Sequence, residues 1–270
     1  MMDINYELYK VFYHVASTLN FSEASKQLFI SQSAVSQSIK TLEKKLDQTL
    51  FIRSTKRVQL TPEGEILLRH IEPAMNLIRR GEAQLMDAAS TGGQIRIGAS
   101  DTICRYFLVP YLKKFHQDFP NAHLKVINQT SIKCVELLET GQVDLIVVNY
   151  PNKYLSNVSS IKKIQKFHDV FIANHSFDYL KEKKLSYQEL SKYPILMLDK
   201  QSTTSEFLHR LFQHHHLDLV PEIELTSNDL LIDLARIGLG IAFIPDYCLS
   251  RQSEDLFVVE TEESLPEREL

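Results

Sequence analysis

Residues 21–43 read FSEASKQLFISQSAVSQSIKTLE, and this stretch decides the fold of the N-terminal part of the chain. Ser22 is suited to cap a short helix over residues 23–28. A tight turn follows, after which Ser31 can cap a longer helix. The apolar face of that longer helix consists of Val35, Ile39, Leu42 and Leu46. Together with an amphipathic helix upstream, this pattern predicts a helix-turn-helix.

The opposite face of the longer helix carries hydroxyls, carboxamides and one cation. Its members are Gln32, Ser33, Ser36, Gln37 and Lys40. Carboxamides can bond adenine through two atoms, hydroxyls suit bases or phosphates, and a helix fits the major groove. A solvated helix surface is the alternative interpretation. The basic segment that follows favours a DNA-binding face over a merely solvated one.

That basic segment, residues 50–60, predicts a β-hairpin with its tip at residues 54–57. Such a hairpin beside a helix-turn-helix is a wing. Arg53, Lys56 and Arg57 would contact phosphates or the minor groove.

A long helix is predicted next, because Thr61 can cap it and Pro62 suits its first position. Its apolar seam consists of Leu67, Ile71, Ala74, Ile78 and Leu85. A helix running to about Ala89 would be about 40 Å long, too long for one small domain to bury its narrow seam. Dimerisation is therefore predicted, with packing inside the chain as the alternative. Pro73 cannot donate to the carbonyl of Arg69, which predicts a kink there.

The composition predicts a globular chain with more than one domain: 270 residues, of which 44% are hydrophobic and 24% charged. No apolar stretch approaches the roughly 18 residues of a membrane helix, and residues 1–10 lack the character of a signal sequence. A cytoplasmic protein without membrane contact is expected. The net charge is −4 overall, but residues 31–60 carry +4 and those from Ser90 onward carry −5. A small basic module attached to a larger acidic one is indicated.

Residues 21–43 resemble the DNA-binding signature of LysR-type transcriptional regulators. The resemblance continues without gaps through Leu46, residues 50–53 and residues 60–64, and the later order of elements follows the family along nearly the whole chain. It implies an α plus α/β architecture: a winged helix-turn-helix, a dimerising linker helix and an effector-binding domain similar to periplasmic solute-binding proteins. The implied partners are double-stranded DNA with an imperfect palindrome, a small-molecule effector and further copies of the chain in a homodimer or homotetramer.

The resemblance also gives expected boundaries. The winged domain would occupy residues 1–60, the linker helix 61–90 and the effector domain 91–270. Within the effector domain, subdomain I would cover about 91–163 and 265–270, and subdomain II about 164–264. The family usually continues through a last strand and helix, which look absent here, so part of subdomain I is expected to be uncovered.

The C-terminal part shows alternating strand and helix patterns, which predict parallel sheets in two subdomains with a cleft between them. The apolar run Leu145 to Val148 is predicted to be a buried central strand. The first unit has predicted strands at 94–98, 124–127 and 143–148 and helices at 109–119 and 132–138. The second has strands at 169–173, 195–198, 222–225 and 241–243 and helices at 206–212 and 229–236.

Small polar residues follow several of these strands, at the sheet edge where open α/β sheets bind ligands. Hydroxyls and free N–H groups at helix starts favour a small anionic ligand. Plain helix capping is the alternative for each residue. The candidate effector-binding residues are Ser100, Thr102, Thr130, Ser131, Ser202, Thr203 and Asn228.

Other motifs are weak. His214–His216, with His209 nearby, could indicate a metal, but neighbouring helical side chains point about 100° apart. Cys104, Cys134 and Cys248 lack the spacing of a disulfide framework or zinc ribbon, although a redox role for Cys104 is an alternative. No catalytic or cofactor motif appears, so neither an enzyme nor a bound cofactor is expected. The main rival hypothesis is a small-molecule sensor whose N-terminal helices are merely structural.

Overall fold

The computed structural model describes residues 4–53, 57–86, 93–157, 160–251 and 255–270. The chain forms two compact units: residues 1–91 with 139–142, and residues 92–138 with 143–270. Among the described residues, no helix combines the length and the apolar character needed to cross a membrane.

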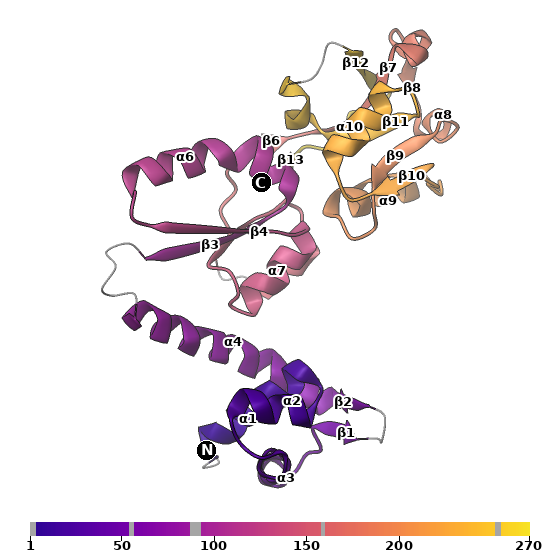
Figure 1. Ribbon diagram of the computed structural model, residues 1–270. Helices are drawn as coiled ribbons and strands as arrows, with labels where there is room; N and C mark the ends of the chain where they lie inside the picture. The colour runs from indigo at the N-terminus through magenta and orange to yellow at the C-terminus, as the bar shows by residue number, and fades with distance from the viewer. Residues whose placement is uncertain (1–3, 54–56, 87–92, 158–159, 252–254) are drawn as a thin grey trace. The chain divides into compact units, whose positions relative to one another are not determined.

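The N-terminal unit has the predicted order of elements (Figure 1). They are α1 Tyr6–Thr18, α2 Phe21–Leu28, α3 Gln32–Leu46, β1 Phe51–Arg53 and β2 Val58–Leu60, with β1 and β2 antiparallel. The Ser31 hydroxyl accepts the Ala34 N–H at 3.2 Å, which confirms the predicted cap of α3. Val35, Ile39 and Leu42 are completely buried, so the predicted apolar face of α3 is confirmed.

The predicted cap of α2 is wrong. The helix begins at Phe21, and the Asn20 side chain accepts the N–H groups of Ser22 and Glu23 at 2.9 and 3.1 Å. Ser22 therefore lies inside the first turn. The helix therefore begins two residues before the predicted start at Glu23, and Phe21, its first residue, is buried in the core.

The long helix α4, Pro62–Met86, begins as predicted. The Thr61 hydroxyl accepts the Gly64 N–H at 3.0 Å. The helix continues through Pro73 without interruption, and a kink at residues 69–73 stays a prediction (Figure 1). Its predicted end near Ala89 lies outside the described residues.

The apolar seam of α4 divides into two parts. Leu67 and Ile71 pack against the core of the N-terminal unit. Farther along, Ile78 and Leu85 are 56% and 80% exposed. The first half of α4 is thus fixed to its own unit, whereas the second half presents apolar side chains to solvent.

The second unit begins with a parallel three-stranded sheet in the order β4-β3-β5. Ile97 and Ala99 of β3 pack with Ile103 and Phe107 on one face. On the other face Gly98 lies against Cys134, where a Cβ would come within 3.4 Å of the sulfur. Helices α6 and α7 cover the two faces (Figure 1). The elements are β3 Gln94–Ala99, α5 Asp101–Ile103, a π-helical turn Cys104–Leu108, α6 Val109–Asp118, β4 His123–Asn128, α7 Ser131–Glu139 and β5 Leu145–Val147.

The run Leu145 to Val148 is not a buried central strand, contrary to the prediction. Strand β5 pairs with β3 alone and forms an edge of its sheet, and Leu145 is 42% exposed. An unbroken apolar run indicates burial on both faces, but the position of a strand in a sheet depends on pairing with distant residues. Strand β3 takes the centre.

The remaining residues build a six-stranded sheet in the order β10-β9-β11-β7-β12-β8. One face packs against α9 through Phe171 and Phe243, and the other against α10 through Ile172 and Ala242. The strands are β7 Asp169–Asn174, β8 Lys184–Leu185, β9 Ile195–Leu198, β10 Ile223–Leu225, β11 Ile241–Pro245 and β12 Leu256–Thr261. The helices are α8 Tyr187–Leu190, α9 Thr203–His214 and α10 Asn228–Arg236.

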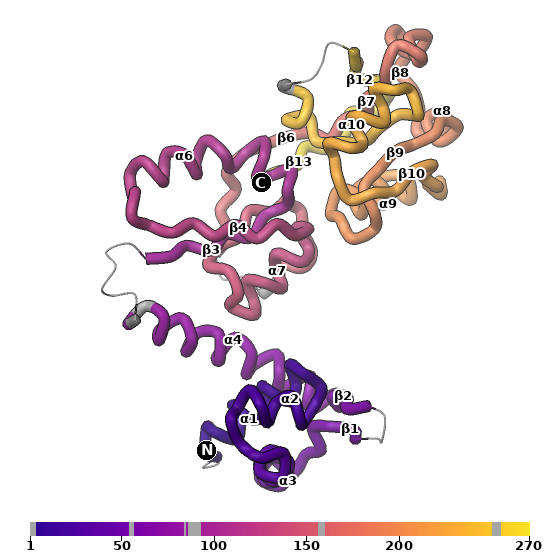
Figure 2. The backbone as a smooth tube through the Cα atoms, in the orientation of Figure 1, coloured from indigo at the N-terminus to yellow at the C-terminus, as the bar shows by residue number. Residues whose placement is uncertain are grey.

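This sheet is mixed, whereas the alternating pattern predicted a parallel one. Strands β10, β9 and β11 are parallel, but β7 runs antiparallel to both β11 and β12. The two-residue strand β8 and the six-residue strand β12 were not predicted. The last residues pair as β13 Arg268–Glu269 with β6 Lys166–Phe167 (Figure 2). Leu270 is buried in the same core cluster as Ile97.

Candidate DNA-binding face and effector cavity

The five residues predicted on the outer face of α3 lie there together. Gln32, Ser33, Gln37 and Lys40 are exposed, and Ser36 is half-buried. On the inner face of the same helix, Val35, Ile39 and Leu42 are completely buried. α3 therefore presents hydroxyls, carboxamides and a cation to solvent on a helix whose orientation is fixed by the core behind it.

In the hairpin, Arg53 has a structural contact that the sequence did not indicate. Its guanidinium lies 4.4 Å from the centre of the Phe21 ring and 3.7 Å from the Glu43 carboxylate. The same carboxylate accepts the Leu50 N–H at 2.9 Å. Arg53 and Glu43 thus fix the hairpin against α2 and α3. Arg57 is exposed, and Lys56 lies outside the described residues.

All seven predicted effector-binding residues line one cavity of about 470 Å³. They come from four helix starts. Ser100 and Thr102 lie at α5, Thr130 and Ser131 at α7, Ser202 and Thr203 at α9, and Asn228 at α10. The cavity also contacts Asn149, Asp101, Asp199 and Tyr247.

Several of these hydroxyls also cap their helices. Ser100 accepts the Ile103 N–H at 3.3 Å, and Ser202 accepts the Ser205 N–H at 3.0 Å. The capping interpretation is therefore correct for Ser100 and Ser202. Because a hydroxyl can donate one bond while it accepts another, capping leaves the proton available for a ligand.

At the cavity, a buried hydrogen bond connects the part of this unit built on the three-stranded sheet with the part built on the six-stranded sheet. The Asn228 Nδ2 group donates to the Thr102 hydroxyl at 2.9 Å, and both residues are at least 91% buried. The side-chain oxygens of Asn228 and Asn149 are buried without a partner among the described residues. Unpartnered buried acceptors are costly, so a ligand with N–H or O–H groups would be stabilised here.

The charges at the cavity differ from the sequence-based picture. Asp101 and Asp199 contribute carboxylates to the wall. Arg105, the cation nearest in sequence, lies 3.5 Å from Asp229 instead of lining the cavity. The positive ends of the helix dipoles at α7, α9 and α10 are therefore the main favourable field for an anionic group.

Sequence reasoning missed Arg268, which lies directly behind the cavity wall. Its Nη1 donates to Asp169 Oδ2 at 2.6 Å and to the Thr204 hydroxyl at 3.1 Å, and its Nη2 donates to the Thr203 hydroxyl at 3.4 Å. Arg268 is 1% exposed and Asp169 is completely buried. Burial raises the pKa of Asp169, and the guanidinium opposes that shift. No local pattern around Arg268 signals burial.

The thiols are free, and their environment disfavours thiolate chemistry. Burial, with a contribution from Asp101, raises the pKa of Cys104 to about 11. Burial also raises the pKa of Cys134 to about 12. Since the thiolate is the reactive form, the structural interpretation of these cysteines is favoured.

The histidines do not converge. His209 lines a different cavity, and His215 lies 3.4 Å from Glu263. Within the described part of the chain, no group of three or more His, Cys, Asp or Glu side chains is placed to hold a metal ion.

Comparison with known proteins identifies both units. Residues 6–65 match the bacterial regulatory helix-turn-helix of the LysR family, and residues 88–270 match the LysR substrate-binding domain. A probable RuBisCO transcriptional regulator of Phaeodactylum tricornutum is 27% identical over 261 residues, covering 94% of this chain and 84% of that protein.

Solved structures share the fold. ArgP from Mycobacterium tuberculosis matches with a TM-score of 0.71 at 18% identity, covering 99% of this chain and 90% of ArgP. Full-length CbnR in complex with its target DNA matches with a TM-score of 0.61 at 19% identity, covering 98% and 92% of the two chains. The chain belongs to the LysR family of DNA-binding transcriptional regulators with an effector-binding domain.

Proposed function

We propose that this regulator recognises its operator through α3 and the hairpin. The exposed polar face of α3, opposite an apolar face that packs on the core, supports this assignment. The residues proposed to read base edges in the major groove are Gln32, Ser33, Ser36 and Gln37. The residues proposed to hold phosphates or the minor groove are Lys40, Arg53, Lys56 and Arg57.

We also propose that the chain acts as a homodimer, or as a homotetramer of two dimers, on an imperfect palindrome. The exposed apolar side chains of Ile78 and Leu85 support a partner helix along the second half of α4. A two-fold symmetric protein places its two recognition helices on two symmetric half-sites.

Two substitutions separate base reading from phosphate binding. Gln37→Ala is expected to lower discrimination at one base pair by about 1–3 kcal/mol, since a bidentate carboxamide contact is lost. Arg57→Ala is expected to weaken binding to all DNA sequences by the same factor. It should also reduce the slope of log K against log salt concentration by about one unit. Fluorescence anisotropy with single-base operator variants at several salt concentrations measures both. Equal weakening of all sequences by Gln37→Ala would contradict its base-reading role.

We propose that the cavity lined by Ser100 and Asn228 binds the effector, a small molecule with an anionic group and at least one N–H or O–H donor. The observation that carries this proposal is the convergence of seven residues from four helix starts on one cavity. Helix N-termini favour the anionic group. The unpartnered oxygens of Asn149 and Asn228 favour the donor.

Ligand binding would act on the two halves of the effector domain. The Thr102–Asn228 hydrogen bond connects two lining residues from different halves of this domain, and a molecule bound in the cavity would contact both halves. A ligand shifts a conformational equilibrium only when it binds the two states unequally. A molecule that bridges both walls binds a closed form more tightly than an open one, and closure is the proposed signal to the DNA-binding part.

The effector assignment is tested by calorimetry after small hydroxy and amino acids have been screened for stabilisation of the wild type. Ser100→Ala and Thr203→Val are each expected to weaken binding of a stabilising compound by about 1.5–3 kcal/mol, the value of a hydrogen bond to a charged group. Ser191→Ala removes an exposed hydroxyl away from the cavity and is the matched control. Unchanged affinity in both cavity variants would place the effector elsewhere.

A further inference from the structure

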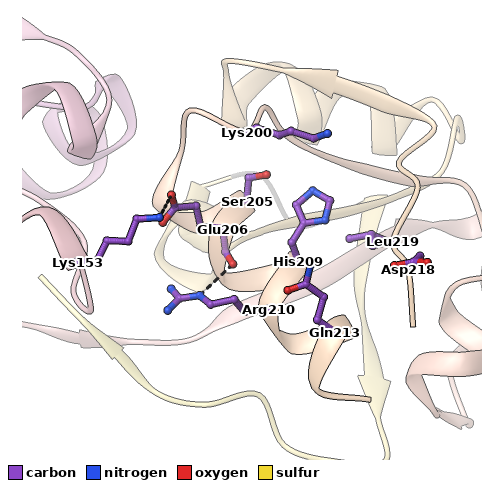
Figure 3. A pocket seen from close by; sticks show the side chains of 9 residues that line it. All are labelled: Lys153, Lys200, Ser205, Glu206, His209, Arg210, Gln213, Asp218 and Leu219. Atoms are coloured by element: carbon purple, nitrogen blue, oxygen red, sulfur yellow. Dashed lines mark hydrogen bonds and ion pairs between the residues drawn. The ribbon is translucent and has the colours of Figure 1, made fainter. Parts of the chain in front are cut away.

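A second cavity, of about 490 Å³, lies along the side of α9. It is separate from the effector cavity, since the two share none of their lining residues. Figure 3 shows the residues around it. They are Lys153, Lys200, Ser205, Glu206, His209, Arg210, Gln213, Asp218 and Leu219.

Two polar groups at this wall lack partners. Ser205 is completely buried, and its hydroxyl has no hydrogen-bond partner among the described residues. The buried Nε2 of His209 likewise has none there. The two residues are four apart in the sequence and therefore share one face of α9. In Figure 3 the Ser205 hydroxyl points to the side of α9 where the His209 ring lies. Both groups can donate a hydrogen bond to a ligand.

The charges around these groups favour an anion. Lys153, Lys200 and Arg210 contribute three cations against the carboxylates of Glu206 and Asp218. Glu206 is already engaged, because its carboxylate lies 2.9 Å from the Lys153 ammonium (Figure 3). Lys200 makes no ion pair within the part of the chain that the structure describes. Its ammonium is therefore available beside the two unpartnered groups.

We propose that this cavity is a second ligand site, which binds the oxyanion group of a small metabolite, either a phosphate or a carboxylate. The Ser205 hydroxyl and the His209 imidazole donate to its oxygens. Lys200 and Arg210 balance its charge. Hydrogen bonds from such groups to an anion are stronger than bonds between neutral partners.

The charge state of His209 gives the site a pH dependence. Burial lowers the pKa of His209, and the nearby Lys200 lowers it further while Glu224 opposes the shift. The imidazole is therefore neutral at neutral pH in the empty site. A bound oxyanion favours the protonated ring, so binding takes up a proton and strengthens as the pH falls. The other charged groups of the wall are Lys153, Glu206, Arg210 and Asp218.

Calorimetric titration of the full chain with inorganic phosphate and, separately, with succinate tests the proposal. At least one probe is expected to bind with one-to-one stoichiometry, and the tighter probe identifies the group. Lys200→Gln and Ser205→Ala are each expected to weaken it roughly tenfold or more. Ser205→Ala removes an unpartnered buried hydroxyl, so this variant should fold as well as the wild type.

Two controls fix the location. Lys192→Gln removes an exposed lysine outside the cavity and should leave binding unchanged, as should Ser100→Ala in the effector cavity. Sulfate, whose charge is constant between pH 6 and 8, should bind the wild type more tightly at the lower pH and lose that gain in His209→Gln. Three outcomes would each overturn the proposal. Neither phosphate nor succinate binds, Lys200→Gln and Lys192→Gln weaken binding equally, or binding is lost only in Ser100→Ala. The effector assignment would stand or fall separately, because its variants lie in the other cavity.

Discussion

Ile78→Glu is expected to separate the proposed dimer and to weaken binding to a two-half-site operator by roughly 100-fold or more, because a monomer would not bind the second half-site intramolecularly. Ile78 lies in the exposed half of the α4 seam and is 56% exposed within its own chain. A carboxylate there would have to be desolvated against an apolar partner helix, which is unfavourable for a charge without a counterion.

The matched control is Ala83→Glu, which adds the same charge to an exposed position of α4 outside the seam. Analytical ultracentrifugation measures the oligomeric state, and anisotropy with half-site and full-site DNA measures affinity. Ile78→Glu should lower full-site affinity while half-site affinity is unchanged. An unchanged oligomer would place the interface on another surface, and an equal effect of Ala83→Glu would show that charge alone is responsible.

Local signals in the sequence were sufficient to predict most of the helices and strands of the N-terminal unit. The caps at Ser31 and Thr61 depend on residues within three positions of each other, and both are confirmed. The α3 face follows from the helical period alone. The predicted cap of α2 was wrong because the side chains of Asn20 and Ser22 are both of a type that caps helices, and in the structure Asn20 does so.

The convergence of the seven candidate effector-binding residues on one cavity was predictable, because parallel strands bring their carboxyl ends to one edge of a sheet. The edge position of β5 and the antiparallel direction of β7 could not be predicted, since both depend on pairing between distant segments. Arg268 shows the limit most clearly. It lies 99 residues from Asp169 in the sequence, and nothing local marks either side chain as buried. Polar residues in a charged segment are normally exposed.

Arg268→Met is expected to destabilise the effector domain by about 3–5 kcal/mol, because it leaves the completely buried Asp169 without its counterion. The guanidinium also lies between two aromatic rings, 5.3 Å from the centre of Phe167 and 5.0 Å from that of Phe207. Urea unfolding followed by circular dichroism measures the loss.

A double substitution separates the charge from the packing. Arg268→Met combined with Asp169→Leu should recover most of the stability, since replacing a whole buried ion pair by apolar side chains is often neutral. The exposed Lys133–Glu136 pair provides the control, and Lys133→Met should cost no more than about 1 kcal/mol. If Arg268→Met cost no more than Lys133→Met, Asp169 would not be a buried carboxylate that needs its partner. Since Arg268 also donates to Thr203 and Thr204, a recovered double variant that still binds its effector weakly would show that the guanidinium positions the cavity wall in addition to stabilising the fold.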